Sequence, residues 1–264
     1  MRVDLGCLNR PWSSFDLGDT LDGIAAAGYK EVGFTNHQGA PVVSADSDEA
    51  SIQRIKDMVG ARGLKLSAVM GRPELTLALP EAVARFEQEI RNIRQAGAQY
   101  IILGGTAQEE LYEKFYAFVE GILPCARQED VTLVLKPHGG ISALSENLLR
   151  ASDRLGSDHF GICYDPGNIY YYTGQRAEDD LPKVADRVVA MCIKDERGGV
   201  HGEVMITPGT GVVDFETIFS ILKDTDFEGP CWVECLGGET VTEINGEAKK
   251  TYRFMQDVVA RVEG

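Results

Sequence analysis

The amino-acid sequence predicts one closed (β/α)8 barrel, a TIM barrel, that spans residues 1–264 as a single domain. Short apolar runs recur at intervals of roughly thirty residues, which is the length of one βα unit. Amphipathic stretches with helical spacing lie between these runs. Regular alternation of strand and helix gives parallel strands joined by helical crossovers. Eight units without a long linker favour closure, and Gly6–Asn9 is not the glycine-rich phosphate loop typical of an open sheet.

The predicted strands share an apolar core and end at polar or glycine-containing turns. In order, they are Val3–Cys7, Glu31–Phe34, Leu66–Met70, Tyr100–Leu103, Thr132–Leu135, Phe160–Tyr164, Val188–Ile193 and Cys231–Val233. The intervening helices show apolar residues three or four positions apart, as in Leu21, Ile24 and Ala25, or Ile52, Ile55, Met58 and Val59. Two further helical faces are Val83, Phe86, Ile90 and Ile93, and Leu111, Phe115, Phe118 and Ile122. We expect helices to end at Gly28, Gly63 and Gly97, and to begin at Ser47, Ser142 and Asp214.

Composition excludes several classes of protein. The chain has 264 residues, 44% of them hydrophobic, which is enough for a sizeable core and excludes wholesale disorder. Its 26 Lys and Arg against 41 Asp and Glu give a formal charge of −15. A broad nucleic-acid or anionic-membrane surface needs clustered positive charge, so neither is expected, although a local cationic pocket is compatible with this balance.

The cysteines and the N-terminal residues predict a soluble cytoplasmic protein. Met1–Leu5 leads directly into a strand-like run with no signal-peptide pattern, and no stretch is apolar enough to span a membrane. The six cysteines are scattered, mostly in apolar runs, with no CxxC spacing. We therefore expect reduced cysteines and neither a disulfide framework nor a zinc ribbon.

Active sites of TIM barrels lie at the carboxyl ends of the strands, and polar residues interrupt four successive strands there. Lys136, Asp165, Cys192 and Glu234 occupy the same position at the ends of the last four strands. Ionisable groups inside a barrel are costly unless they are used, so we expect these residues to form the site.

At these residues the chain resembles the sugar phosphate isomerase/epimerase family of xylose isomerase-like TIM barrels. The matching motifs are His138-Gly139-Gly140, Asp165-Pro166-Gly167, Lys194-Asp195, Pro208–Gly211 with Val213-Asp214-Phe215, and Glu234. The resemblance covers essentially the whole chain. It implies one divalent metal, held by Glu, Asp, His and Glu at the ends of the last four strands. The metal polarises a carbonyl and its neighbouring hydroxyl while carboxylates move the proton.

The chain departs from that ligand set at three positions. Lys136 stands where the family has a Glu, Cys192 where it has a His, and Asn168 where a His often follows the strand-six Asp. A protonated lysine has no lone pair for a metal, and its charge opposes a cation beside it. Any Mn, Mg, Zn or Co ion would be held by Asp165, Glu234 and His138, at a weakened site.

Our hypothesis is that the Lys136 ammonium replaces the metal between Asp165 and Glu234. Without a cation, two buried carboxylates would force one of them to take up a proton. We assign Glu234 as general base, Asp165 as its counterpart, and His138 to a shared role or to a substrate hydroxyl. The alternatives for Lys136 are a purely structural salt bridge and a Schiff base with a carbonyl substrate.

Seven further residues are predicted to contact substrate. The lysine and arginines could bind a phosphate or carboxylate, the alternative being solvated loop charges. An aromatic ring near the mouth could stack on a sugar face, the alternative being loop packing. For Cys192, the alternative to a substrate contact is a packing role in the core. The set is His37, Arg72, Asn168, Cys192, Lys194, Arg197 and Trp12.

These residues predict an isomerase or epimerase that acts on a sugar, keto-sugar or inositol-like compound through an enediolate. A lyase or dehydratase acting through the same enediolate, and a non-catalytic sugar-binding paralogue, are the alternatives. A DNA-repair endonuclease is disfavoured because the chain is acidic and has only four histidines. The expected partner is a small carbohydrate-like molecule, and a homo-oligomer is compatible with the sequence.

Overall fold

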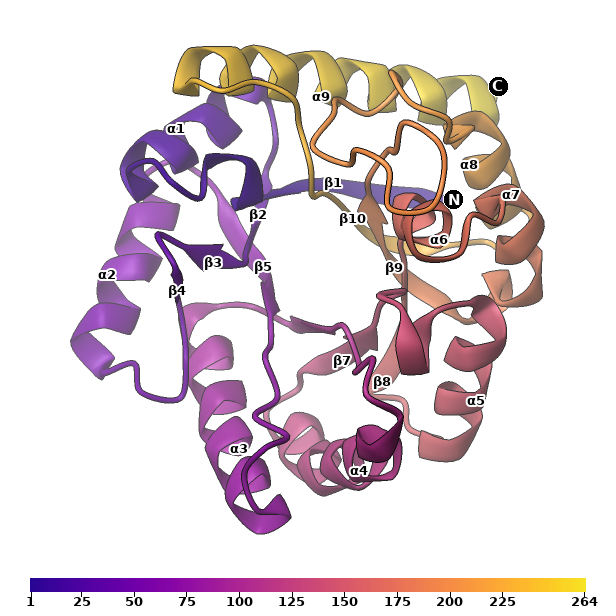
Figure 1. Cartoon of the computed structure of the whole chain (residues 1–264). Helices are drawn as coiled ribbons and strands as arrows, with labels where there is room; N and C mark the ends of the chain where they lie inside the picture. Colours follow the sequence, from indigo (N-terminus) through magenta and orange to yellow (C-terminus); the bar gives the residue numbers. More distant parts are fainter.

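The computed structural model describes all residues 1–264 and confirms the closed barrel. Eight parallel strands follow one another around it, and Figure 1 shows the helices as a ring outside them. The strands are β1 (Arg2–Leu8), β2 (Glu31–Phe34), β5 (Lys65–Met70), β6 (Tyr100–Leu103), β7 (Thr132–Leu135), β8 (Phe160–Tyr164), β9 (Val188–Ile193) and β10 (Glu228–Val233). Five of these coincide with the predicted ranges, and the other three are longer by one to three residues.

The helices that cover the barrel differ greatly in length. They are α1 (Leu17–Ala27), α2 (Glu49–Gly60), α3 (Leu79–Ala96), α4 (Tyr112–Gln128), α5 (Ser145–Leu155), α6 (Pro166–Thr173), α7 (Ala177–Asp180), α8 (Phe215–Lys223) and α9 (Val241–Glu263). Short 3-10 turns include η1 (Arg10–Trp12), directly after β1, and η3 (Gly140–Ser142), after β7. None of the helices is long and apolar enough to cross a membrane.

Three of the six predicted helix boundaries are confirmed, and three are displaced. Gly28 and Gly97 end α1 and α3 in the left-handed conformation, and the Asp214 side chain caps α8. Asp48, rather than Ser47, caps α2 by accepting the Ser51 backbone N–H. Gly63, predicted to end a helix, lies in the turn after α2 has ended at Gly60. Ser142, predicted to begin a helix, is the last residue of η3 and does not begin α5.

A feature absent from the sequence prediction is the hairpin of β3 (Asn36–His37) and β4 (Ala40–Pro41). It follows β2 and lies beside η1, on the side of the barrel coloured indigo and violet in Figure 1. Strands of two residues carry no detectable period, so the pattern of apolar residues gives no signal for them.

The apolar core has two parts, as the alternation of side chains along each strand requires. One fills the barrel itself with small or flat side chains, and the Trp232 indole there donates to Ser67 Oγ at 2.9 Å. The other lies between strands and helices and contains 63 buried residues. Cys231 and Val233 belong to this outer layer, so Glu234, like Trp232, faces inward at the mouth. All six cysteines are unpaired and buried, as predicted.

Candidate active site

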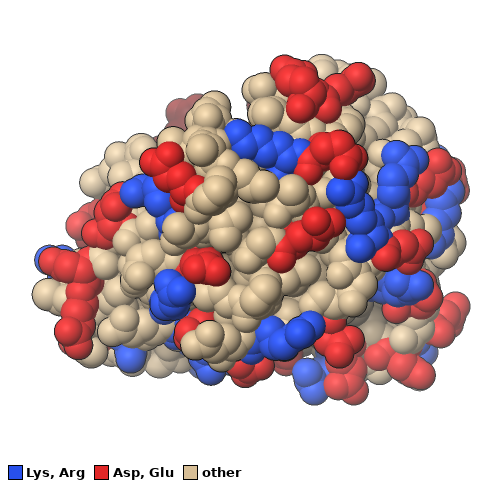
Figure 2. All heavy atoms as spheres, turned by 90° about the horizontal axis from the view of Figure 1, so that it is seen from below, with Lys and Arg blue, Asp and Glu red and all other residues tan.

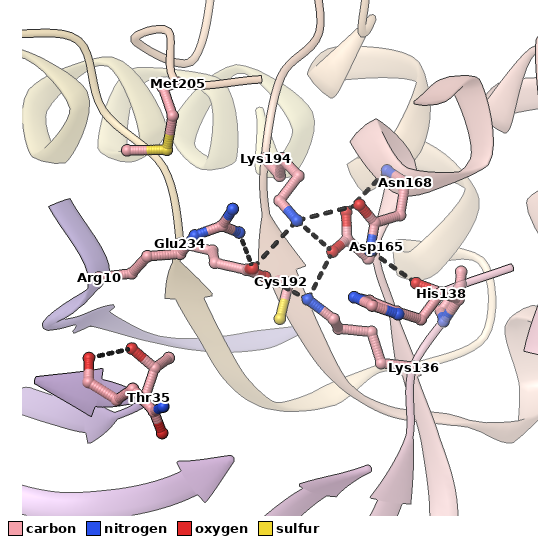
Figure 3. A network of polar contacts seen from close by, with 12 residues as sticks. Arg10, Thr35, Lys136, His138, Asp165, Asn168, Cys192, Lys194, Met205 and Glu234 are labelled. Atoms are coloured by element: carbon pink, nitrogen blue, oxygen red, sulfur yellow. Dashed lines mark hydrogen bonds and ion pairs between the residues drawn. The ribbon is translucent and has the colours of Figure 1, made fainter. Parts of the chain in front are cut away.

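Four charged residues stand at the first position after a strand, at one end of the barrel. Lys136 follows β7, Asp165 follows β8, Lys194 follows β9 and Glu234 follows β10. A fifth, Arg10, reaches them from η1 after β1 (Figure 3). Because adjacent parallel strands end at the same edge, this repeated position brings the side chains together. We call these five residues the charged cluster.

The two lysines lie between the two carboxylates. Lys136 Nζ donates to Glu234 Oε2 and lies 3.1 Å from Asp165 Oδ2. Lys194 Nζ donates to Glu234 Oε1 at 3.0 Å and lies 3.3 Å from the same Asp165 oxygen. These contacts with Asp165 Oδ2 are charge contacts rather than aligned hydrogen bonds, and that buried oxygen receives no hydrogen bond.

Lys136 and Lys194 differ in how many acceptors surround them. Lys194 Nζ has three, because it also donates to Asn168 Oδ1 at 3.0 Å. Lys136 Nζ has two, one on each carboxylate. An ammonium group carries three N–H donors. Lys194 thus has a nearby acceptor for each of its N–H groups, whereas Lys136 has one N–H group more than it has nearby acceptors, beside Asp165 Oδ2, which receives no hydrogen bond.

The charges in the cluster hold one another ionised. Burial alone would raise the pKa of Glu234, but Lys136, Lys194 and Arg10 outweigh it and hold that pKa well below its usual value. Burial alone would lower the pKa of Lys136, but Glu234 and Asp165 raise it well above the usual value. Glu234 and Lys136 are 2% and 1% exposed, so neither charge is screened by water.

The loop after β8 fixes the position of Asp165. Asp165 Oδ1 caps α6 by accepting the Asn168 backbone N–H at 2.9 Å. The Asn168 side chain donates to the Pro137 carbonyl at 2.6 Å, which ties this loop to the end of β7. A Cβ on Gly167 would lie 2.8 Å from the Lys194 carbonyl oxygen, so only glycine permits this approach. The turn thus brings the carboxylate and Lys194 together.

His138 lies at the mouth beside the cluster. Its ring is exposed and packs against Tyr172, whose hydroxyl is 3.2 Å from His138 Nε2. Partial burial and the charges of Lys136 and Lys194 lower its pKa to about 4. Because the ring reaches solvent, repulsion from the two ammonium groups is the firmer cause. His138 is therefore a neutral imidazole at neutral pH.

Sequence reasoning predicted Lys194 as a substrate contact, with a solvated loop charge as the alternative, and did not identify Arg10. Lys194 is 2% exposed and belongs to the charged cluster, so it is neither a solvated loop charge nor a separate anion site. Arg10 Nη1 contacts Glu234 Oε1, and its side chain is 37% exposed. Arg10 could have been found from its position directly after the first strand, because active-site residues of TIM barrels follow the carboxyl ends of all eight strands.

Two predicted substrate contacts are wrong because the side chains are engaged inside the protein. Trp12 is fully buried, and its Nε1 donates to Asn245 Oδ1 of α9 at 2.8 Å, so its ring cannot stack on a sugar. Asn168 is buried with both ends of its amide bonded to the protein, so it positions Lys194 instead of meeting a ligand.

The other predicted contacts make no hydrogen bond or ion pair with the charged cluster. Arg72 and Arg197 are exposed on the loops after β5 and β9. His37 lies on β3, where its Nδ1 is 3.3 Å from Asn9 Nδ2 and its Nε2 is buried without a partner. Cys192 lies inside the barrel, with its Sγ 3.7 Å from Cys163 Sγ.

A divalent metal does not fit these residues. Asp165, Cys192 and Glu234 lie close enough together to form a possible ligand set, and His138, predicted as a ligand, is not part of it. However, the contact with Cys163 and burial raise the pKa of the Cys192 thiol well above its usual value. Both carboxylates already contact Lys136 and Lys194, which offer no lone pairs. A cation would have to displace two ammonium groups.

Two other surface features lie away from the charged cluster or lack its chemistry. A cavity of about 450 Å³ lies against α9 near the amino ends of β1 and β2, and none of the charged cluster lines it. On the face shown in Figure 2, acidic and basic side chains are interspersed and do not form a broad positive surface. The charged cluster is therefore the candidate active site.

Comparison with known proteins shows the family of the chain. The family described as xylose isomerase-like TIM barrel matches residues 21–258. An inosose dehydratase of Clostridium perfringens is 28% identical over 148 residues, half of each chain. An L-ribulose-5-phosphate 3-epimerase of Escherichia coli is 27% identical over 189 residues, 70% of this chain and 64% of the relative. A xylose isomerase domain protein from Planctomyces limnophilus superposes over 100% of this chain and 99% of its own, with a TM-score of 0.79 and 17% identity, which shows the fold.

Proposed function

Because the chain belongs to the xylose isomerase-like TIM barrel family, we propose that it is an isomerase or epimerase of a small sugar-like compound. The proposed reaction removes a proton next to a carbonyl, forms an enediolate and returns the proton to a different position. The relatives named above are an L-ribulose-5-phosphate 3-epimerase and an inosose dehydratase, and the chain matches only 50 to 64% of their lengths. The reaction is therefore argued from the cluster.

The observation that carries the proposal is the pair formed by Lys136 and Asp165. Lys136 Nζ has an unused donor, and 3.1 Å away Asp165 Oδ2 has no hydrogen bond. A carbonyl oxygen with a neighbouring hydroxyl needs one donor and one acceptor at this spacing. The Lys136 ammonium would stabilise the negative oxygen of the enediolate in a site shielded from water, which is the role the family gives to its metal.

Glu234 is the proposed general base. Its carboxylate stays ionised at neutral pH because three cations surround it, which also makes it a weak base in the absence of substrate. When substrate oxygens take hydrogen bonds from Lys136, Glu234 loses part of that stabilisation and becomes more basic. Asp165 holds both ammonium groups in place, and neutral His138 at the mouth binds a substrate hydroxyl.

The same contacts argue against a Schiff base on Lys136. A lysine attacks a carbonyl only as the neutral amine, which needs a lowered pKa. Here Glu234 and Asp165 raise the pKa of Lys136 instead. We therefore assign Lys136 to electrostatic stabilisation.

A dehydratase is the second candidate, favoured by the match to inosose dehydratase. An enediolate that expels a neighbouring hydroxyl loses water, whereas one that is reprotonated yields an isomer or epimer. The two outcomes share the first step and differ only in the fate of the intermediate.

The first step can be tested without knowing the natural substrate. Ketoses, ketose phosphates, inososes and keto-acid sugars are incubated with the protein in D₂O, and exchange of the C–H next to the carbonyl is followed by NMR. We expect exchange with at least one compound, lost in Lys136→Met and Glu234→Gln and kept in Lys30→Met, which changes an exposed lysine at the far end of the barrel. Exchange without loss of water identifies an isomerase or epimerase, and loss of water a dehydratase. Binding without exchange would overturn the proposal in favour of a sugar-binding protein.

A further inference from the structure

The charged cluster carries more positive than negative charge. Arg10, Lys136 and Lys194 contribute three positive charges, and Asp165 and Glu234 contribute two negative ones. His138 and Cys192 are neutral by the arguments above. The four buried charges balance, so the surplus of one positive charge falls on Arg10, whose side chain is 37% exposed. A ligand that covers Arg10 removes its charge from water, which is costly unless the ligand supplies a negative charge.

The acidic residues that follow Lys194 do not remove the surplus. Asp195 is fully buried, and its carboxylate accepts the backbone N–H groups of Gly209, Gly211 and Val213 at 2.8 to 3.1 Å. The neighbouring Glu196 carboxylate accepts the Gly198 N–H. Both carboxylates are turned toward the loop after β9 and not toward the charged cluster.

Arg10 is the most exposed cation of the cluster. Lys136 and Lys194 are 1% and 3% exposed in their side chains, against 37% for Arg10. A guanidinium has five N–H donors, and only Nη1 of Arg10 has a side-chain partner, Glu234. Figure 3 shows the side chain extending from the β1 side toward Glu234. The remaining donors match the two oxygens of a carboxylate.

The loop after β9 argues against a phosphate. Gly209-Thr210-Gly211 is the glycine-rich segment that could cradle one, but Asp195 already accepts the N–H groups of both glycines. A phosphate would also bring close to two negative charges to a site with a surplus of one.

We propose that the substrate is a sugar acid whose carboxylate pairs with Arg10, so that one negative charge completes the cluster. This rests on the proposed function in taking the ligand to be sugar-like. Arg10 then determines specificity and takes no part in the proton transfer. A neutral sugar leaves the surplus uncompensated, and a sugar phosphate overcompensates it.

The test uses three probes that differ only at one end: glucuronate, glucose and glucose 6-phosphate, titrated calorimetrically. We expect glucuronate to bind at least about tenfold more tightly than the other two, the difference that one charge-assisted contact produces. Arg10→Met should abolish this preference, Arg10→Lys should keep part of it, and Arg54→Met, an exposed arginine on α2, should leave it intact. Circular dichroism of each variant checks that it is folded.

Equal affinity for the three probes, absence of binding by all three, or a preference that survives Arg10→Met would overturn the inference. Preference for glucose 6-phosphate would show a phosphate site instead. The proposed function is judged separately by exchange in D₂O: exchange on neutral ketoses alone would refute the carboxylate but keep the reaction. A carboxylate preference without exchange on any compound would keep the carboxylate site but refute the proposed reaction.

Discussion

Replacing Lys136 by methionine tests whether the cluster is held together by its charges. The change removes one ammonium group, keeps an unbranched side chain one atom shorter, and leaves Lys194 and Arg10 to offset two buried carboxylates. Removing one partner of a buried ion pair destabilises proteins by about 3 to 5 kcal/mol. Because Lys194 still bridges Asp165 and Glu234, we expect a loss near the lower end, about 3 kcal/mol.

The loss should depend on pH in a defined direction. In the natural chain the pKa of Glu234 is lowered, so its stabilisation is present above the unfolded value and is lost as pH falls through the folded value. Without Lys136 the pKa of Glu234 rises, so Glu234 of the variant takes up a proton at a higher pH. Protonation removes the uncompensated buried charge and with it part of the loss of stability. The gap in stability between the two proteins therefore narrows as the pH is lowered.

Urea unfolding at about pH 8 and about pH 5 measures both effects. A loss below about 1 kcal/mol, or one that is the same at both pH values, would refute the reasoning. Lys30→Met, at an exposed position, is the matched control and should change little. A double-mutant cycle with Glu234→Gln should show a coupling of about 0.5 to 3 kcal/mol between the two positions.

Three further predictions concern the metal, the histidine and the buried tryptophan. Treatment with EDTA or Mn²⁺ should leave the melting temperature of the natural chain unchanged, whereas Lys136→Glu with Cys192→His should gain a Mn²⁺-dependent rise; a rise in the natural chain would contradict the fit argument. His138 should titrate by NMR with a pKa of about 4, so the native state loses stability relative to the unfolded state as pH falls from 6.5 toward that value. Lys136→Met should move the pKa of His138 toward 6.5, and an unchanged pKa would show that Lys136 does not lower it. Trp12→Phe should lose about 1 to 2 kcal/mol with its hydrogen bond to Asn245, while sugar binding stays unchanged; weaker binding would restore Trp12 to the site.

The fold was predictable because each strand buries a continuous apolar run, and that pattern is local in the sequence. Lys136, Asp165 and Glu234 followed from it, since the strand ends determine which residues meet. The burial of Lys194 was not predicted because lysine is usually solvated, and here Asp165, Glu234 and Asn168 make its burial favourable. Trp12 was misplaced because the helix that covers it, α9, lies more than two hundred residues away along the chain.

A lysine can supply a metal's charge but not its coordination, and this difference limits what the site can do. A divalent ion accepts lone pairs from any oxygen around it, whereas an ammonium group donates along three fixed directions. At Lys136 one N–H donates to Glu234, and Asp165 Oδ2 lies close enough to occupy a second, which leaves at least one for the substrate. The second oxygen that a metal would hold must be bound elsewhere, by the free acceptor of Asp165 or by the imidazole of His138. The substrate is therefore expected to offer one oxygen as an acceptor and its neighbour as a donor, which is the arrangement of a carbonyl beside a hydroxyl.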